Sequence, residues 1–109
     1  MIYLANALSI NMFSHFTKPF KLNIKPISTA EASTILKSTK FTSAIGHADI
    51  ANILTNILGV NVTPNRITLN INPGDTLIIA QYIGPRLPEG TTELPVNATI
   101  KFYLITIEA

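Results

Sequence analysis

The sequence contains no cysteine, and only 13% of its 109 residues are charged. Without cysteine, the chain has no disulfide, no thiolate zinc site and no thiol nucleophile. No apolar run reaches the length of about 18 residues that a transmembrane helix needs. The apolar segment at residues 1–10 is interrupted by Asn6 and Ser9 and lacks the basic start of a signal peptide. A glycine-rich phosphate loop, a dinucleotide fingerprint and a His-x-x-x-His metal pair are also missing.

What is present indicates a folded domain. Hydrophobic residues make up 47% of the chain, which excludes intrinsic disorder. The length predicts a single domain, residues 1–109, that buries roughly two-thirds of its unfolded surface. The net charge of +2 is too small to indicate a nucleic-acid or membrane partner by itself. Because the sequence shows neither a transmembrane run nor a signal peptide, we expect a soluble, intracellular protein.

Apolar runs and apolar/polar alternation predict the strands. They are expected at residues 1–5, 20–25, 67–71, 76–80 and 100–107, with a brief extended segment at 41–45. The last two strands are apolar on both faces, which is typical of central strands. Asn72-Pro73-Gly74-Asp75 is a strong turn signal, so we expect residues 67–71 and 76–80 to form a hairpin.

Two helices are predicted. Ser28 and Glu31 form a capping box ahead of a short helix over residues 29–38. Residues 47–58 carry apolar side chains at helical spacing, and Gly59 then ends the helix. The element order predicts an α+β fold with a sheet of about five strands and helices packed on it. Because two short helices leave part of one sheet face bare, we expect a homodimer.

His47 is the first candidate for chemistry, since it follows Gly46 directly at the start of the second helix. A helix N-terminus carries exposed N–H groups and about half a unit of positive charge, so it attracts anions such as phosphate. The glycine would let a ligand approach the backbone closely. The alternative is a surface histidine that only caps the helix.

Two loops supply the other candidates. Arg86 and Glu89 lie in a proline-rich loop at residues 84–95, and arginine matches phosphate bidentately. The alternative is a solvated ion pair of little energetic weight. Ser9 and Asn11 follow the first strand, where hydroxyl and amide groups can hold a phosphate or a base edge, or simply form turns.

Four motifs occur in order along the chain: YLANALSINM at residues 3–12, SAIGH at 43–47, Asn65-Arg66, and RLPEG at 86–90. Together they resemble the viral ring nuclease family, anti-CRISPR proteins of archaeal viruses that oppose type III CRISPR immunity. The resemblance implies an enzyme with no metal or cofactor that degrades cyclic tetraadenylate and so silences messenger-activated defence. It also implies a mixed sheet of about five strands and a homodimer in the host cytoplasm, with the ring in a pocket across both subunits.

By motif, the resemblance makes His47 the general acid. Arg86 and Glu89 would position and stabilise the reacting phosphate. The segment that matches the lining of the ligand pocket contains Asn6, Ser9 and Asn11.

The chemistry of RNA cleavage agrees with these roles. A neighbouring 2′-hydroxyl attacks the phosphate, the leaving 5′-oxygen needs a proton, and an arginine offsets the developing charge. DNA lacks that hydroxyl, so we expect no activity on duplex DNA. The main alternative is a viral nucleic-acid-binding or transcription-regulating protein without catalysis, although eight basic residues are few for that role.

Overall fold

The computed structural model describes residues 1–108. In chain order the elements are β1 (Ile2–Ala5), the 3₁₀ helix η1 (Ile10–Phe13), β2 (Lys21–Ile27), α1 (Thr29–Ser38), β3 (Thr42–Ser43), α2 (Ala48–Leu58), β4 (Thr76–Ile83) and β5 (Thr99–Glu108). The strands form one five-stranded sheet in the order β2-β5-β4-β1-β3. β1 is parallel to β3 and β4, whereas β5 is antiparallel to both β4 and β2. The predicted α+β class and mixed five-stranded sheet are therefore confirmed.

Both predicted helices are confirmed. The capping box of α1 is complete, because Ser28 Oγ accepts from the Glu31 N–H at 3.0 Å and Glu31 Oε1 accepts from the Ser28 N–H at 3.2 Å. His47 is the N-cap of α2, and Gly59 ends that helix in the left-handed region at φ 69°. Neither helix, and no other helix within residues 1–108, is long and apolar enough to cross a membrane.

The strand predicted at residues 67–71 is wrong, and the hairpin with it. The two edges of β4 are already paired with β1 and β5, so no position beside it remains. Leu69 and Ile71 are buried as the alternation predicted, but they lie in an extended segment outside the sheet. The Ile71 N–H donates to the carbonyl of Met12 at 2.9 Å instead of to a strand. The alternation therefore marked one-sided burial, which a covering segment shares with a strand.

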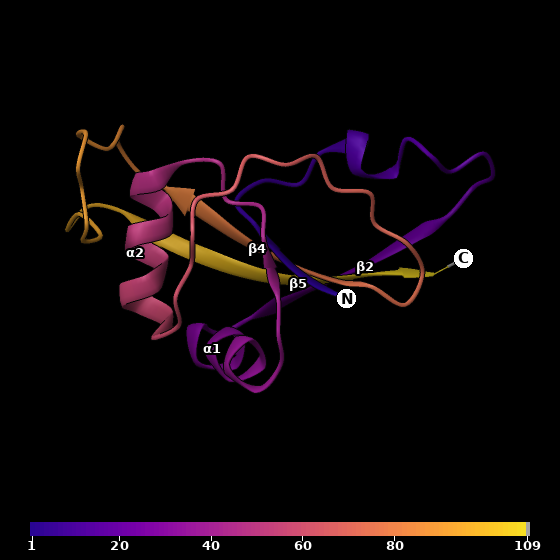
Figure 1. Cartoon of the computed structure of the whole chain (residues 1–109), viewed down its shortest axis with the longest axis horizontal. Coiled ribbons are helices and arrows are strands. Elements are labelled where there is room, and N and C mark those ends of the chain that lie inside the picture. Colours follow the sequence, from indigo (N-terminus) through magenta and orange to yellow (C-terminus); the bar gives the residue numbers. More distant parts are fainter. Residues whose placement is uncertain (109) are drawn as a thin grey trace.

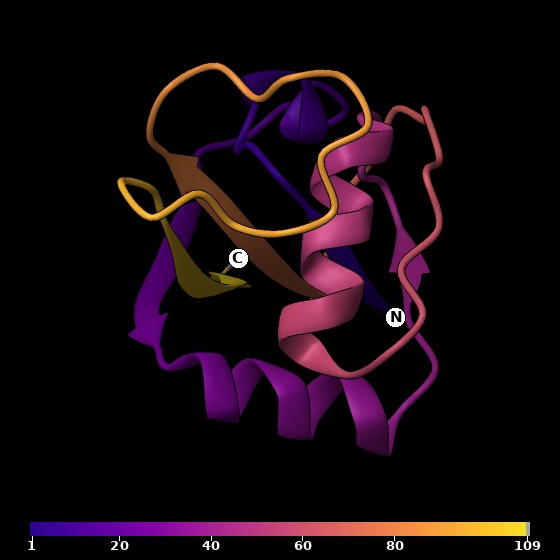
Figure 2. The same cartoon turned by 90° about the vertical axis from the view of Figure 1, so that its left-hand side faces the viewer.

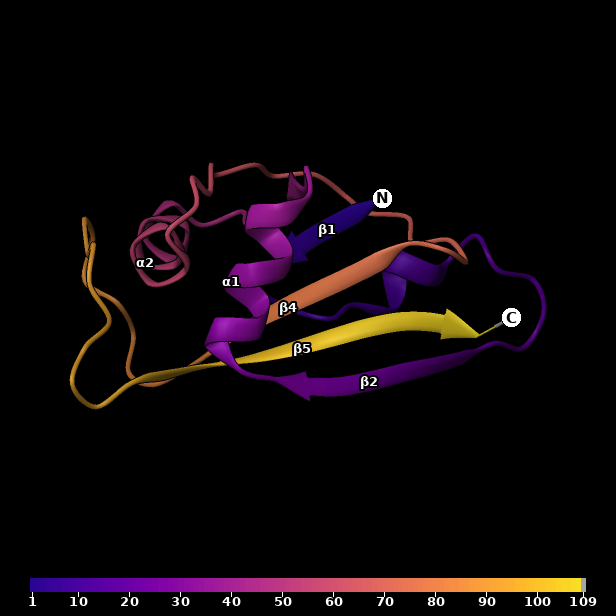
Figure 3. The ribbon, with the colours of Figure 1, turned by 90° about the horizontal axis from the view of Figure 1, so that it is seen from below.

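The two faces of the sheet are covered differently (Figures 1 and 3). One face packs under α1 and α2, in a core that includes Leu36, Leu54 and Ile78. The other face packs under η1 and the segment before β4, in a core built from these residues: Ala5, Met12, Phe13, Leu69, Ile71, Leu77, Ile79, Ile105 and Ile107. This second cover is partial, since Ile24 and Ile83 on the same face remain 48% and 46% exposed.

The three mutually parallel strands end at one end of the molecule. The chain leaves β1 into residues 6–11, leaves β3 toward Gly46 and His47, and leaves β4 into the loop at residues 84–98. Figure 2 looks at this end and shows the β4–β5 loop, in orange to yellow, running alongside α2. Crevices at the carboxyl ends of parallel strands are common ligand sites. The topology thus gathers the segments that carry the candidate residues.

Candidate functional site

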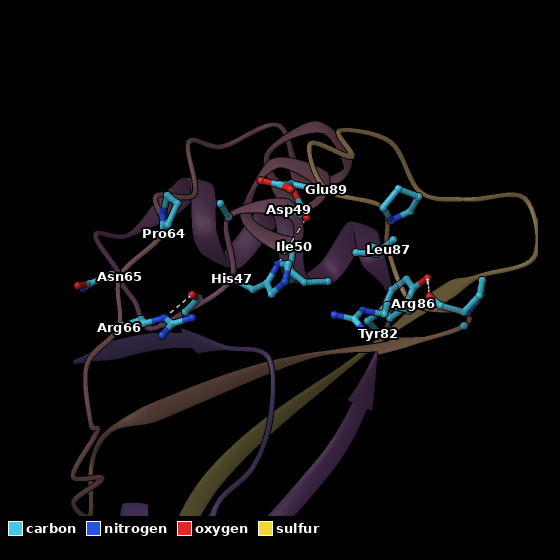
Figure 4. A pocket seen from close by; sticks show the side chains of 15 residues that line it. His47, Asp49, Ile50, Pro64, Asn65, Arg66, Tyr82, Arg86, Leu87 and Glu89 are labelled. Atoms are coloured by element: carbon cyan, nitrogen blue, oxygen red, sulfur yellow. Dashed lines mark hydrogen bonds and ion pairs between the residues drawn. The ribbon is translucent and has the colours of Figure 1, made fainter.

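A cleft of about 1130 Å³ lies at this end of the sheet. Its walls are residues 46–50 at the start of α2, residues 64–66 of the covering segment, and Tyr82 with residues 84–89 after β4. Three predicted site residues far apart in the sequence, His47, Arg86 and Glu89, line this one cleft (Figure 4).

His47 stands at the helix end with its side chain accessible. Its backbone is extended, at φ −116° and ψ 121°, and its side chain makes no capping hydrogen bond. The side chain is 55% exposed. The imidazole therefore makes no capping contact, although His47 still caps α2 through its backbone carbonyl, which accepts from the Ala51 N–H at 3.1 Å. The catalytic role of His47 stays a prediction.

Two arginines flank His47 in the cleft. In Figure 4 the side chains of Arg66 and Arg86 reach from opposite sides toward the space in front of the histidine ring. Arg66 Nε donates to the carbonyl of Gly46 at 3.1 Å, which fixes its direction. Among residues 1–108, no ion pair engages Arg86. Guanidinium groups on both sides of a histidine can hold a phosphate between them.

Arg66 is a site residue that the sequence did not single out. Its neighbour Asn65 donates from its side chain to the carbonyl of Ser43 and from its backbone to that of Ile45, both at 2.8 Å. These contacts pin the segment beside the chain that leaves β3. Only the Asn65-Arg66 pair among the ordered motifs hinted at a role for this position.

Gly46 serves this arrangement by having no side chain. A Cβ at this position would lie 3.2 Å from Cγ of Arg66, tighter than ordinary van der Waals contact. The space that the sequence assigned to an approaching ligand is thus taken by the arginine stem. Gly46 still lines the cleft, and its direct contact with a ligand stays a prediction.

The two carboxylates of the cleft differ in environment. Glu89 is exposed and, among the described residues, forms no ion pair with Arg86. Asp49 is buried, with Oδ1 accepting from the Gly90 N–H at 3.1 Å and Oδ2 lying 3.9 Å from Nδ1 of His47. Asp49 lies in the first turn of α2, where the helix dipole favours a negative charge, but local sequence does not reveal its contact with Gly90, which is 41 residues away along the chain.

The β4–β5 loop is held closed at its base. A Cβ on Gly84 would lie 2.5 Å from Cβ of Ala98, so the two ends of the loop touch. The Tyr82 hydroxyl donates to the carbonyl of Pro85 at 2.6 Å. Farther along, the Asn56 side chain of α2 donates to the carbonyl of Thr92 at 2.7 Å. The contacts at the base fix residues 84–85, next to Arg86, whereas the Asn56 contact anchors a part of the loop that does not line the cleft.

Asn6, Ser9 and Asn11 lie in a second, smaller hollow of about 240 Å³. Ser9 accepts from the Asn11 N–H at 3.3 Å and so caps η1. The hollow shares no lining residue with the cleft, but it borders the same two segments, through Ala44 on one and Ile67 on the other. The described chain therefore brings together His47, Arg86, Glu89 and Gly46, and places the N-terminal polar residues next to them.

No group of three or more His, Asp or Glu side chains within residues 1–108 is arranged to hold a metal ion. The second histidine, His15, lies outside the cleft, where its Nε2 is 2.9 Å from the side-chain oxygen of Asn72.

Similarity to known proteins places the chain among archaeal viral proteins. It is 32% identical over 90 residues to uncharacterized protein 26 of Sulfolobus islandicus filamentous virus (isolate Iceland/Hveragerdi), covering 83% of this chain and 74% of that protein. It is also 37% identical over 92 residues to uncharacterized protein ORF117 of Acidianus two-tailed virus. This match covers 83% of this chain and 75% of that protein.

A solved structure of an archaeal viral protein has the same fold. The structure of B116 of Sulfolobus turreted icosahedral virus matches with a TM-score of 0.75 and 24% identity, covering 96% of this chain and 97% of that one. The STIV B116-like family model matches residues 2–104. The chain is a member of the STIV B116-like family of archaeal viral proteins.

Proposed function

We propose that this protein is a metal-independent ring nuclease that cleaves cyclic tetraadenylate in the cytoplasm of the infected host cell and so suppresses type III CRISPR signalling. The observation that carries the proposal is the cleft in which His47 stands between Arg66 and Arg86. A proton donor can protonate the leaving oxygen of a phosphodiester, and guanidinium groups beside it can stabilise the charge that develops on the phosphate.

The reaction uses the substrate's own nucleophile. The adenosine 2′-oxygen attacks the phosphorus and loses its proton to solvent water, and the bond from phosphorus to the 5′-oxygen breaks. His47 gives a proton to that 5′-oxygen, so the products carry a 2′,3′-cyclic phosphate and a 5′-hydroxyl. Arg86 offsets the charge that grows on the non-bridging oxygens, and Glu89 orients Arg86 or the attacking hydroxyl.

The cleft is large enough for a nucleotide ligand. Its volume of about 1130 Å³ is near the upper end of the range of roughly 300–1,000 Å³ that is usual for small-molecule pockets. The adjoining hollow, with Asn6, Ser9 and Asn11, extends the polar surface available to an oligonucleotide. These features support an adenylate ring as the ligand.

A homodimer completes the proposal. A ring with two-fold symmetry matches a site with two-fold symmetry that presents one His47 from each subunit. The apolar side chains left bare on one face of the sheet, including Leu8, Ile24 and Ile83, support burial against a second copy.

The decisive experiment is chromatography of the products formed from synthetic cyclic tetraadenylate. We expect linear products ending in a 2′,3′-cyclic phosphate, formed in the presence of a chelator. A ring built from 2′-deoxyadenosine should stay intact because it lacks the nucleophile. Duplex DNA is the parallel substrate: binding to DNA with no turnover of the ring would replace our proposal by the nucleic-acid-binding alternative.

A further inference from the structure

Asp49 is a buried carboxylate that the reaction above does not use. The residue is 8% exposed, although it lies only two positions after the N-cap of α2. Taking a carboxylate out of water is costly unless hydrogen bonds or opposite charges compensate. The helix dipole supplies part of that compensation. The remainder comes from partners that differ between its two oxygens.

The two oxygens of Asp49 face two different parts of the cleft. Oδ1 accepts from the backbone N–H of Gly90 at 3.1 Å, and Oδ2 lies 3.9 Å from Nδ1 of His47. Gly90 ends the RLPEG sequence that contains Arg86 and Glu89. One carboxylate thus contacts both the proposed general acid and the loop that carries the proposed phosphate-binding groups.

We propose that Asp49 is a positioning residue that sets the His47 ring and residues 86–90 in register with each other, an inference that rests on the proposed ring nuclease function. Because Nδ1 is on the Asp49 side, Nε2 is the ring nitrogen left to meet the leaving 5′-oxygen. The first turn of α2 holds Asp49 rigidly, so the helix sets the distance between histidine and loop.

The loop has a second anchor on the same helix, which provides a matched control. Asn56 donates to the carbonyl of Thr92 at 2.7 Å, two helical turns away from the cleft, and does not line it. Removing Asn56 loosens the loop without touching the surroundings of His47. The comparison between Asp49 and Asn56 therefore separates positioning of the histidine from general loop anchoring.

The test compares Asp49→Asn, Asp49→Ala and Asn56→Ala with the wild-type chain. Asparagine keeps an oxygen that can accept from Gly90 but loses the charge that faces His47. The readouts are kcat and KM on synthetic cyclic tetraadenylate and exchange of the Gly90 amide by NMR, with circular dichroism to verify folding.

We expect Asp49→Asn to lower kcat about tenfold with KM within about twofold, and to leave Gly90 exchange near wild type. Asp49→Ala should lower kcat/KM by about 10²-fold, because the loop also shifts, and should speed Gly90 exchange about tenfold. Asn56→Ala should keep kcat and KM within about twofold, as expected for a contact outside the cleft.

Wild-type kcat in both Asp49 variants would overturn the positioning role, as would an equal loss in Asn56→Ala. If Asp49→Ala does not fold, the split between kcat and KM in Asp49→Asn decides alone. A wild-type protein that leaves the ring intact overturns the proposed function and the positioning role together. Faster Gly90 exchange in Asp49→Ala would still show that Asp49 anchors the loop, so the two failures are distinguishable.

Discussion

Helix α2 takes part in two regions that differ in nearly every physical respect. On the side that faces the sheet, Ile50, Leu54 and Leu58 are 6%, 0% and 1% exposed. At its N-terminal end, the His47 side chain is 55% exposed and lies between the side chains of Arg66 and Arg86. The core region depends on apolar area removed from water, and the cleft depends on the placement of a few polar groups. Stability and chemistry should therefore respond to different substitutions in this one helix.

His47→Ala should give the largest effect and should act on the cleft alone. If His47 is the general acid, as proposed, its loss should lower turnover of cyclic tetraadenylate by about 10² to 10⁴. Because the side chain is exposed, the free energy of unfolding should change by no more than about 0.5 kcal/mol. Turnover is measured with labelled ring, and unfolding with urea. Wild-type turnover in this variant would remove His47 from the mechanism.

Leu54→Ala should give the opposite pattern. A fully buried leucine replaced by alanine leaves a cavity and is expected to cost about 2–5 kcal/mol of unfolding free energy. Leu54→Met, which nearly conserves volume, should cost less than about 1.5 kcal/mol. Urea titration measures both. At a temperature where Leu54→Ala is still folded, kcat should stay close to wild type, and a loss as large as that of His47→Ala would contradict the separation of the two regions.

Arg86→Ala sharpens the assignment within the cleft. If Arg86 stabilises charge in the transition state, its loss should raise the barrier by roughly 3 kcal/mol, which is about a hundredfold in kcat. Arg86→Lys should recover little, because an ammonium lacks the two-pronged geometry. Lys18→Ala, an exposed cation outside the cleft, is the control. A rise in KM with kcat unchanged would instead make Arg86 a ground-state anchor.

The smallest effect is expected at the open end of the sheet. Ile24 is half-exposed on the less completely covered face, so Ile24→Ser should weaken a homodimer that buries it by about tenfold in dissociation constant. Val96→Ser, in the exposed β4–β5 loop, is the matched control. Light scattering across a concentration series measures both. A wild-type chain that stays at 11.9 kDa at micromolar concentration would contradict the shared pocket.

The two helices could be predicted from the sequence, because capping residues and apolar spacing within each segment determine them. The bounds and capping box of α1 follow from Ser28, Glu31 and helical spacing, and the buried face of α2 follows from its period. The strand predicted at residues 67–71 was wrong because alternation reports which side chains are buried but not which backbone groups pair. In the sheet, both edges of β4 pair with other strands, β1 and β5.

The candidate site was predictable in its residue types but not in its assembly. His47, Arg86 and Glu89 could each be singled out from their local settings, yet their meeting depends on β3 and β4 lying on either side of β1. Arg66 and the second role of Asp49 depend on contacts with residues 20 and 41 positions away, which no local pattern reports.

The touching ends of the β4–β5 loop have a consequence for how this family can diversify. Since Gly84 and Ala98 meet at its base, the loop starts and finishes at one point of the fold. Residues inserted or deleted between them change the rim of the cleft without altering the register of β4 on β5. Doubling the length of such a loop costs only about 0.6 kcal/mol in closure entropy. The rim of the cleft can therefore change through loop length while the sheet and the helix end that carries His47 stay constant.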